Sequence, residues 1–143
     1  MILGTGVDIA EIERITRAID GPHGERFRER VFTDAERRWC EGQGRGRAES
    51  YAARFAAKEA VMKALGVGWG PGAGWLDIEV VRERGRAPRI ALSGRALATA
   101  RELGVERVHL SLSHAGGIAA AFVVAEGAVQ APPGVLTRAG SSP

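Results

Sequence analysis

The most regular pattern of apolar and polar positions in the chain lies between residues 50 and 65. Ala fills six of these positions, and Leu, Met, Glu, Lys and Arg fill most of the others, all of them residues that favour helices. With about 100° between neighbouring positions, the apolar side chains form one stripe, which contains Phe55, Val61, Met62 and Leu65. The pattern predicts a central helix, with Ser50 as its N-cap and Gly66 just beyond its C-terminus.

A period of two predicts a first strand over residues 1–9. Val7 and Ile9 alternate with Asp8, so we expect the carboxylate on the face opposite to these two apolar side chains. We expect the strand to enter a turn at Asp8.

The second half of the chain predicts a hairpin, a helix and two further strands. Residues 76–84 and 89–92 are separated by a Gly/Pro turn and predict the hairpin. Residues 93–104 predict the helix. In residues 108–114 the apolar side chains are expected to face the core and the polar ones the opposite side, namely His109, Ser111 and Ser113. Residues 118–125 are apolar throughout and predict a fully buried strand.

Three short helices are predicted ahead of the central one. The first follows the N-terminal strand, presents Arg14 and Arg17 outward and ends at residues 21–22, Gly-Pro. The second covers residues 26–32 and presents Arg26 and Arg30 outward. The third opens with the capping box formed by residues 33–36, Thr-Asp-Ala-Glu.

Composition and length bound the class of protein. A chain of 143 residues is one domain by length. Its longest apolar run, residues 118–125, is too short to span a bilayer, and no cationic segment precedes an apolar one at the N-terminus. The single cysteine, Cys40, excludes an internal disulfide framework. We therefore expect a cytoplasmic protein.

The basic residues are unevenly spread. The net charge is only +3, but ten arginines lie between positions 14 and 54, against seven acidic residues. Such a surface suits an acidic partner, which leaves nucleic acid, an anionic nucleotide and an acidic protein as alternatives.

Lysine is rare in this chain, and the positions of the two lysines indicate a role in proton transfer. Of the twenty basic residues eighteen are Arg, and both lysines, Lys58 and Lys63, lie in the predicted central helix. Lys can pass on a proton, whereas Arg cannot. The structural alternative is a solvated Glu59–Lys63 pair one turn apart, with Lys58 extending past its apolar neighbours.

Two carboxylates, Asp8 and Glu59, are candidate ligands of one magnesium ion, because Mg²⁺ is usually held by one or two carboxylates together with substrate phosphates and water. Ser113 and His114, at the end of a strand, could donate to a phosphate. Each of these residues also has a structural alternative, as a turn aspartate or a surface histidine. The glycine-rich residues 66–74 lack the order of a P-loop, and no GxSxG elbow supports a hydrolase triad.

Three motifs in this order resemble the holo-acyl-carrier-protein synthases, the small class of 4′-phosphopantetheinyl transferases. They are GTGVDIAEIERI, RFAAKEAVMKALG and SLSHAGGIAAAFVVAE. The resemblance covers residues 1–126 and leaves residues 127–143 as a Pro/Gly/Ser-rich tail that we expect to be disordered. It implies an α+β fold, a compact single domain with an antiparallel sheet packed against a long central helix. It also implies a homotrimer with active sites between subunits.

The resemblance further implies transfer of the 4′-phosphopantetheine group of coenzyme A to a serine of apo acyl carrier protein, with release of 3′,5′-ADP. By matching positions, Asp8 and Glu59 would hold Mg²⁺, and Lys63 would stabilise or protonate the leaving phosphate. The expected coenzyme A contacts are Arg47, Arg54, Lys58, Lys63, Pro88, Ser113 and His114, with Arg45 near the 3′-phosphate. The acidic carrier protein would dock on Arg14, Arg17, Arg26 and Arg30, and a role in fatty acid biosynthesis follows.

Other readings of the same residues remain. A metal-dependent hydrolase of nucleotides or of the coenzyme A pyrophosphate would use the same carboxylates with water as the nucleophile. A basic nucleic-acid-binding module would not need Asp8 or Glu59, and a non-catalytic coenzyme A binder would not need Lys63. The general base for the serine, the choice between fatty-acid and polyketide carrier proteins, and the use of acyl-coenzyme A donors stay open.

Overall fold

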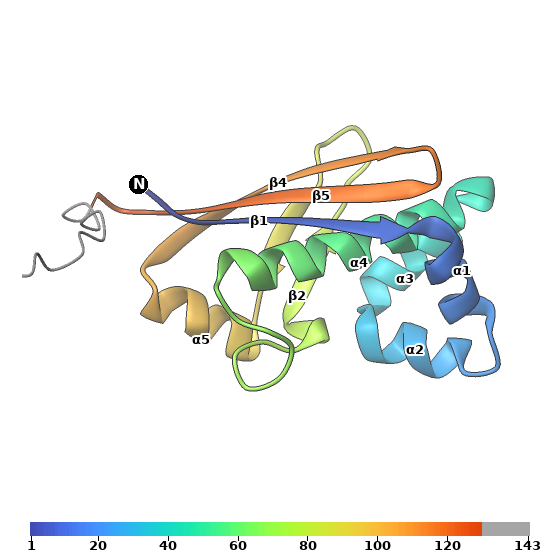
Figure 1. Ribbon diagram of the computed structural model, residues 1–143, viewed down its shortest axis with the longest axis horizontal. Helices are drawn as coiled ribbons and strands as arrows, with labels where there is room; N and C mark the ends of the chain where they lie inside the picture. The colour runs from blue at the N-terminus through green and yellow to red at the C-terminus, as the bar shows by residue number, and fades with distance from the viewer. Residues whose placement is uncertain (130–143) are drawn as a thin grey trace, which may run out of the picture.

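The computed structural model describes residues 1–129. A three-stranded antiparallel sheet runs the length of the molecule, in the order β1 (Ile2–Glu11), β5 (Ile118–Gly127), β4 (Val105–Ala115). The central helix α4 (Arg47–Ala64) packs along one face of this sheet (Figure 1). The predicted α+β class, a single compact domain with an antiparallel sheet on a central helix, is confirmed. The end of the predicted tail, residues 130–143, lies outside the described residues.

Shorter elements surround this core. Helices α1 (Ile12–Asp20), α2 (Gly24–Val31) and α3 (Asp34–Glu41) cluster at one end of α4 (Figure 1). A hairpin of β2 (Ile78–Val81) and β3 (Arg89–Leu92) follows α4, and α5 (Gly94–Glu102) leads into β4. The predicted order of helices, hairpin and strands is confirmed, as is the capping box that joins Thr33 to Glu36. No helix within residues 1–129 is long and apolar enough to cross a membrane.

Helix α4 begins earlier than predicted, and Ser50 lies inside it. A short 3₁₀ turn, η1 (Gly44–Gly46), runs directly into the helix, so Gly46 is the N-cap. The predicted C-terminus is confirmed. Gly66 has a φ of +68°, its N–H donates to the carbonyl of Lys63, and the N–H of Val67 donates to the carbonyl of Met62. These two bonds form a Schellman motif, which satisfies carbonyls that the helix end would otherwise leave free.

Two glycines let β1 approach α4 at backbone distance. A Cβ on Gly4 would lie 2.0 Å from the carbonyl oxygen of Ala64, and one on Gly6 would lie 1.9 Å from that of Ala60. No residue with a side chain fits at these positions. Because side chains alternate along a strand, Asp8 shares the face of Gly4 and Gly6 and therefore points toward α4.

The other face of the sheet is apolar and exposed. Val7 is 57% and Ile9 61% exposed, and Phe122, which pairs with Val7 across β1 and β5, is 48% exposed. The prediction that residues 118–125 form a fully buried strand is therefore wrong, since only the face of Ala119, Ala121, Val123 and Ala125 is buried. The predicted turn at Asp8 is also wrong, because β1 continues to Glu11. Alternation showed which residues share a face, not which face the helix covers.

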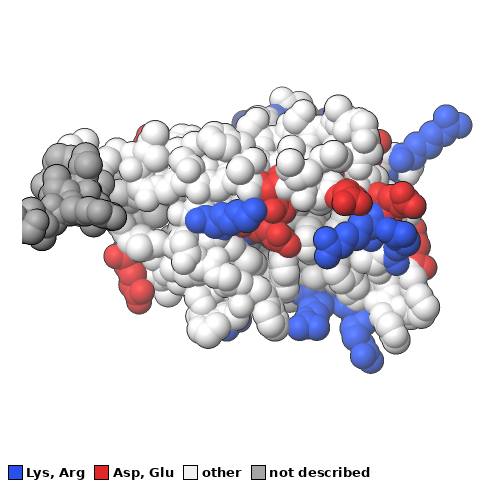
Figure 2. Space-filling view, in the orientation of Figure 1, with Lys and Arg blue, Asp and Glu red and all other residues white. Residues whose placement is uncertain are grey.

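Charged side chains are also distributed unevenly over the surface of the molecule. In the view of Figure 2, charged side chains gather over the end of the molecule formed by α1–α3, while the surface along the sheet is largely uncharged. Arg14 and Arg17 on α1, and Arg26 and Arg30 on α2, are all exposed, as the sequence predicts.

Candidate functional site

The first group of predicted site residues meets where β1 passes the second half of α4. The Nζ atom of Lys63 lies 2.9 Å from Oδ1 of Asp8 and donates to the carbonyl oxygen of Val7 at 3.0 Å. The side chain of Asp8 is 12% exposed and that of Lys63 is 55% exposed. The hydrogen bond to Asp8 raises the pKa of the Lys63 ammonium, so this group carries its proton at neutral pH.

Glu59 completes this group one helical turn before Lys63. Partial burial raises the pKa of Glu59, and the neighbouring charge of Asp8 raises it further. Two carboxylates that disfavour each other's ionisation are suited to share a hard cation, which removes that repulsion. Within the described residues no cluster of three or more His, Cys, Asp and Glu side chains could hold a metal. Asp8 and Glu59 alone supply the carboxylate oxygens that a magnesium ion prefers, and substrate phosphates and water would have to complete its coordination.

The second group lines a cleft of about 360 Å³ on the other side of α4. Four predicted coenzyme A contacts line it, namely Arg54, Pro88, Ser113 and His114. The cleft also takes in residues that the sequence did not single out, namely Trp39, Gln43, Glu49 and Arg82. The Nδ1 atom of His114 lies 3.7 Å from a carboxylate oxygen of Glu49.

Arg54 is the most constrained cation of this cleft. Its side chain is buried, Nη1 donates to the carbonyl oxygen of Ser50 at 3.2 Å, and Nε has no hydrogen-bond partner among residues 1–129. Burial lowers the pKa of the guanidinium. The guanidinium groups of Arg54 and Arg82 each lie 5.9 Å from the ring centroid of Trp39. Two guanidinium groups around one indole form a cationic wall that suits a phosphorylated ligand.

Trp39 and Arg82 carry no signal in the sequence that links them to Arg54. They lie on α3 and just beyond β2, and only the packing of the hairpin against α3 and α4 brings them together. The concentration of arginines in the first third of the chain was the one available hint, and it does not include Arg82.

The two groups flank α4 from opposite sides. Asp8 lies on β1, and the cleft residues Ser113 and His114 lie on β4, with β5 between these strands. On α4, at about 100° per residue, Glu59 and Lys63 fall on one flank of the face that packs on the sheet, and Arg54 falls on the other. We call the group of Asp8, Glu59 and Lys63 and the cleft around Arg54 the two half-sites. Within one copy of the chain they face in different directions.

Lys58 does not fit the expected contact with a phosphate. Its side chain is completely buried, and its ammonium group pairs with Oε1 of Glu36 at 2.7 Å. It also donates to the carbonyl oxygens of Trp75, at 2.9 Å, and of Ile78. Glu36 in turn accepts from the backbone N–H of Val80 at 2.9 Å. Every ammonium hydrogen of Lys58 therefore has a partner within the protein.

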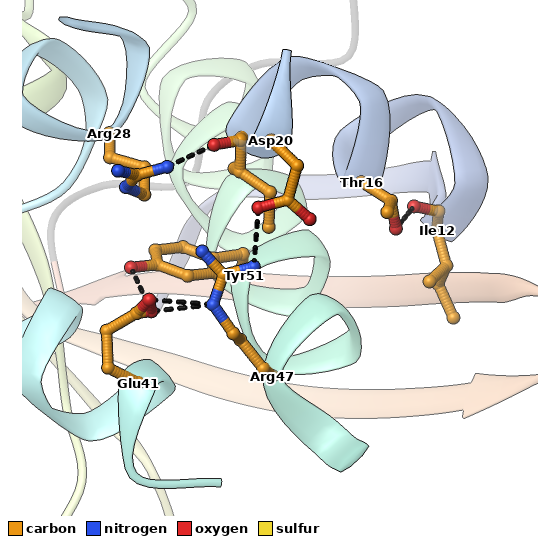
Figure 3. Close-up of polar contacts among 8 residues, drawn as sticks. Ile12, Thr16, Asp20, Arg28, Glu41, Arg47 and Tyr51 are labelled. Atoms are coloured by element: carbon orange, nitrogen blue, oxygen red, sulfur yellow. Dashed lines mark hydrogen bonds and ion pairs between the residues drawn. The ribbon is translucent and has the colours of Figure 1, made fainter. Parts of the chain in front are cut away.

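Arg47 does not line the cleft either. Its guanidinium group is held by Glu41 and Asp20, at the ends of α3 and α1, as Figure 3 shows, and it is not among the residues that line the cleft. Arg45, in the η1 turn, is exposed.

Comparisons with known proteins agree with the motifs. The family model of the 4′-phosphopantetheinyl transferase superfamily matches residues 4–123. A holo-[acyl-carrier-protein] synthase of Anaeromyxobacter dehalogenans is 53% identical over 130 residues, which cover 90% of this chain and 98% of the relative. One of Koribacter versatilis is 48% identical over 126 residues, 88% of this chain and 99% of the relative.

Solved structures give the same result. The Neisseria meningitidis synthase has a TM-score of 0.79 and 33% identity, covering 88% of this chain and 99% of that one. The Helicobacter pylori synthase, solved in complex with coenzyme A, has a TM-score of 0.74 and 33% identity, covering 85% of this chain and 99% of that one. The chain therefore belongs to the 4′-phosphopantetheinyl transferase superfamily and, within it, to the holo-[acyl-carrier-protein] synthases.

Proposed function

We propose that this protein transfers the 4′-phosphopantetheine group of coenzyme A to a serine hydroxyl of apo acyl carrier protein and releases 3′,5′-ADP. The observation that carries the proposal is the group formed by Asp8, Glu59 and Lys63, with its paired carboxylates and its protonated lysine. These side chains can hold a metal ion and neutralise the charge of a pyrophosphate. The name of the family indicates acyl carrier protein as the acceptor, and the relative solved with coenzyme A indicates the donor.

In the reaction, the serine oxygen forms a bond to the phosphorus that carries pantetheine, and the bond from this phosphorus to the oxygen of the leaving 3′,5′-ADP breaks. Asp8 and Glu59 would hold Mg²⁺, which neutralises charge on the pyrophosphate when bound. Lys63 stabilises the leaving phosphate and can return a proton to it. The serine proton leaves to a base that stays unassigned between Asp8, Glu59 and a water.

The cleft is the proposed site of the adenosine end of coenzyme A. The Nε–H of Arg54, which has no partner in the described part of the chain, and the exposed guanidinium of Arg82 can donate to the 3′-phosphate. Ser113 and His114 supply further donors, and Pro88 offers an apolar contact for the base. Lys58 and Arg47 are not part of this proposed set, because their partners lie within the protein.

We further propose that a complete site forms between two copies of the chain, in a homotrimer. Two observations support this assembly. The half-sites flank α4 on opposite sides, so one ligand bridges them most directly where two copies meet. The outer face of the sheet presents a continuous apolar surface around Val7, Ile9 and Phe122, which a second copy can cover.

Arg14 and Arg17 are the proposed docking residues for the acidic carrier protein, with Arg26 and Arg30 beside them. All four are exposed, and Arg30 lies 5.2 Å from the ring centroid of Trp69. Complementary charge would steer encounter and fix the register of the complex. The cytoplasmic location and the link to fatty acid biosynthesis stay predictions.

The test is the intact mass of purified apo acyl carrier protein after incubation with this protein, coenzyme A and Mg²⁺. We expect a gain of one phosphopantetheine group, which is lost with Asp8→Ala and on chelation of the metal with EDTA. Cleavage of coenzyme A to 3′,5′-ADP with no gain in mass would instead show a hydrolase. Intact coenzyme A with several carrier proteins would contradict both activities.

A further inference from the structure

Arg47 is the first residue of α4, and its guanidinium group is already occupied (Figure 3). Its Nε lies 2.7 and 2.6 Å from the two carboxylate oxygens of Glu41, and its Nη1 lies 2.9 Å from Oδ1 of Asp20. The guanidinium carbon lies 5.4 Å from the ring centroid of Tyr51, whose hydroxyl donates to Glu41 at 3.4 Å. The pKa of Glu41 is lowered, mainly by this hydrogen bond to Arg47.

The partners of Arg47, and not its position on the helix, keep its side chain out of the cleft. The residues at the start of α4 that line the cleft are Glu49, Ser50, Ala53 and Arg54, which follow Gly46 along one flank of the helix. Arg47 points to nearly the same side of α4 as Arg54, seven residues on, but its guanidinium group lies over the ring of Tyr51 and turns toward the ends of α1 and α3. Because two carboxylates already neutralise and hydrogen-bond this guanidinium group, it is not available to bind a phosphate in the cleft.

The contacts of Arg47 instead join three helices. Asp20 is the last residue of α1 and Glu41 the last residue of α3. A second arginine, Arg28 of α2, donates to the carbonyl oxygen of Ile19 and so holds the same end of α1. The C-terminal end of α1 is thus fixed by two guanidinium groups, while its other end continues directly from β1, the strand that carries Asp8.

We propose that Arg47 is a positioning residue for the carrier-protein docking helix α1, and not a ligand of coenzyme A. The proposal rests on the function proposed above, because α1 carries Arg14 and Arg17. Arg47 fixes the direction in which these two arginines project relative to Asp8, which must receive the serine of the docked carrier protein. Its loss lets the end of α1 shift and weakens docking, while the cleft keeps its shape.

Steady-state kinetics with each substrate varied in turn test this assignment. For Arg47→Ala we expect KM for the carrier protein to rise about three- to tenfold, the range of two partly exposed ion pairs, with KM for coenzyme A and kcat unchanged. Asp20→Asn removes the negative charge that pairs Arg47 with α1 but keeps an acceptor oxygen, so it should raise the same KM by less. For Arg47→Lys we expect a KM for the carrier protein between those of wild type and Arg47→Ala, because one ion pair remains.

Arg101→Ala is the matched control. It removes an exposed arginine from the last turn of α5, away from both half-sites, and should leave every parameter unchanged. A general loss of folded protein would lower the apparent kcat of Arg47→Ala and leave both KM values unchanged, which would overturn the assignment. A rise in KM for coenzyme A alone would also overturn it and would make Arg47 a phosphate ligand.

Hydrogen exchange of the free protein gives a readout that does not need catalysis. We expect Arg47→Ala and Asp20→Asn to speed exchange of the amides in the last turn of α1, with α5 unchanged as an internal reference. Unchanged exchange in α1 would overturn the assignment even if the kinetics agree. Absence of any transfer by the wild-type protein, together with faster exchange in α1, would locate the failure in the proposed function and not in the contact.

Discussion

The two lysines of the chain lie five residues apart on α4 and end in opposite environments. Lys58 is completely buried, and its partners are Glu36 and two backbone carbonyls. Lys63 is 55% exposed and pairs with Asp8, one of the two candidate metal ligands. The same residue type thus closes a structural network at one position and presents a reactive ammonium at the other.

The two ammonium groups differ in whether water or a ligand can replace their partners. Burial lowers the pKa of Lys58, and only its complete set of partners makes a charge tolerable there. The pKa of Lys63 is raised by Asp8, and water or a phosphate can replace that partner. We conclude that scarcity of lysine in the sequence marked two special positions, but only one of them is available to a substrate.

The largest expected effect is on stability, from Lys58→Ala. This change leaves the carboxylate of Glu36 buried without its cation, so we expect the free energy of unfolding to fall by about 3–5 kcal/mol. Urea denaturation followed by circular dichroism measures the change. A loss below about 1 kcal/mol would show that Lys58 is not a structural residue and would return it to the candidate phosphate contacts.

Lys63→Ala should have the opposite profile. We expect kcat for phosphopantetheine transfer to fall by about 10²–10⁴-fold, the usual contribution of a positioned group that stabilises or protonates a leaving group. The midpoint of thermal unfolding should stay at the wild-type value, because the side chain is largely exposed. Full activity of this variant would remove Lys63 from the proposed mechanism.

A double-mutant cycle sharpens the assignment of Lys58. Glu36→Gln keeps an acceptor for the N–H of Val80, and Lys58→Met keeps the length of the side chain. We expect the two changes to be coupled by about 0.5–3 kcal/mol, with the double variant losing less stability than the sum of the single variants. Strictly additive losses would mean that the ion pair itself contributes nothing.

The smallest expected effect comes from Lys63→Arg. Arg keeps the positive charge beside Asp8 but cannot give up a proton. We expect kcat to fall only about threefold to tenfold, because the charge that stabilises the leaving phosphate remains. At high pH we expect the activity of the wild-type protein to fall, because Lys63 loses its proton. The activity of Lys63→Arg should not show this fall, because Arg keeps its charge. A loss as large as that of Lys63→Ala would assign it the proton transfer itself.

Sequence patterns predicted the elements well and their surroundings less well. The helix, the hairpin and the strands are local, so periodicity and capping residues identify them. The glycines at positions 4 and 6 show why the face of β1 was not predictable. Only when α4 is seen packed against them does it become clear that Asp8 points toward the helix and that Val7 and Ile9 point away from it.

The candidate site was predictable in the same partial way. The motifs identified Asp8, Glu59 and Lys63, which do meet in space, and four of the residues that line the cleft. The pairing of Lys58 with Glu36 was not predictable because Glu36 lies in a capping box that already explained it locally. The roles of Trp39 and Arg82 depend on three elements that come together only in the folded chain.

A mixing experiment tests most directly whether the site is divided between copies of the chain. Asp8→Ala impairs one half-site, and the double variant His114→Ala/Arg82→Ala impairs the other. We expect each protein alone to be nearly inactive in the intact-mass assay. Co-expressed and purified as mixed oligomers, they should regain activity, because about a quarter of the sites then combine two intact halves. Mixed oligomers no more active than the separate variants would contradict a site shared between copies.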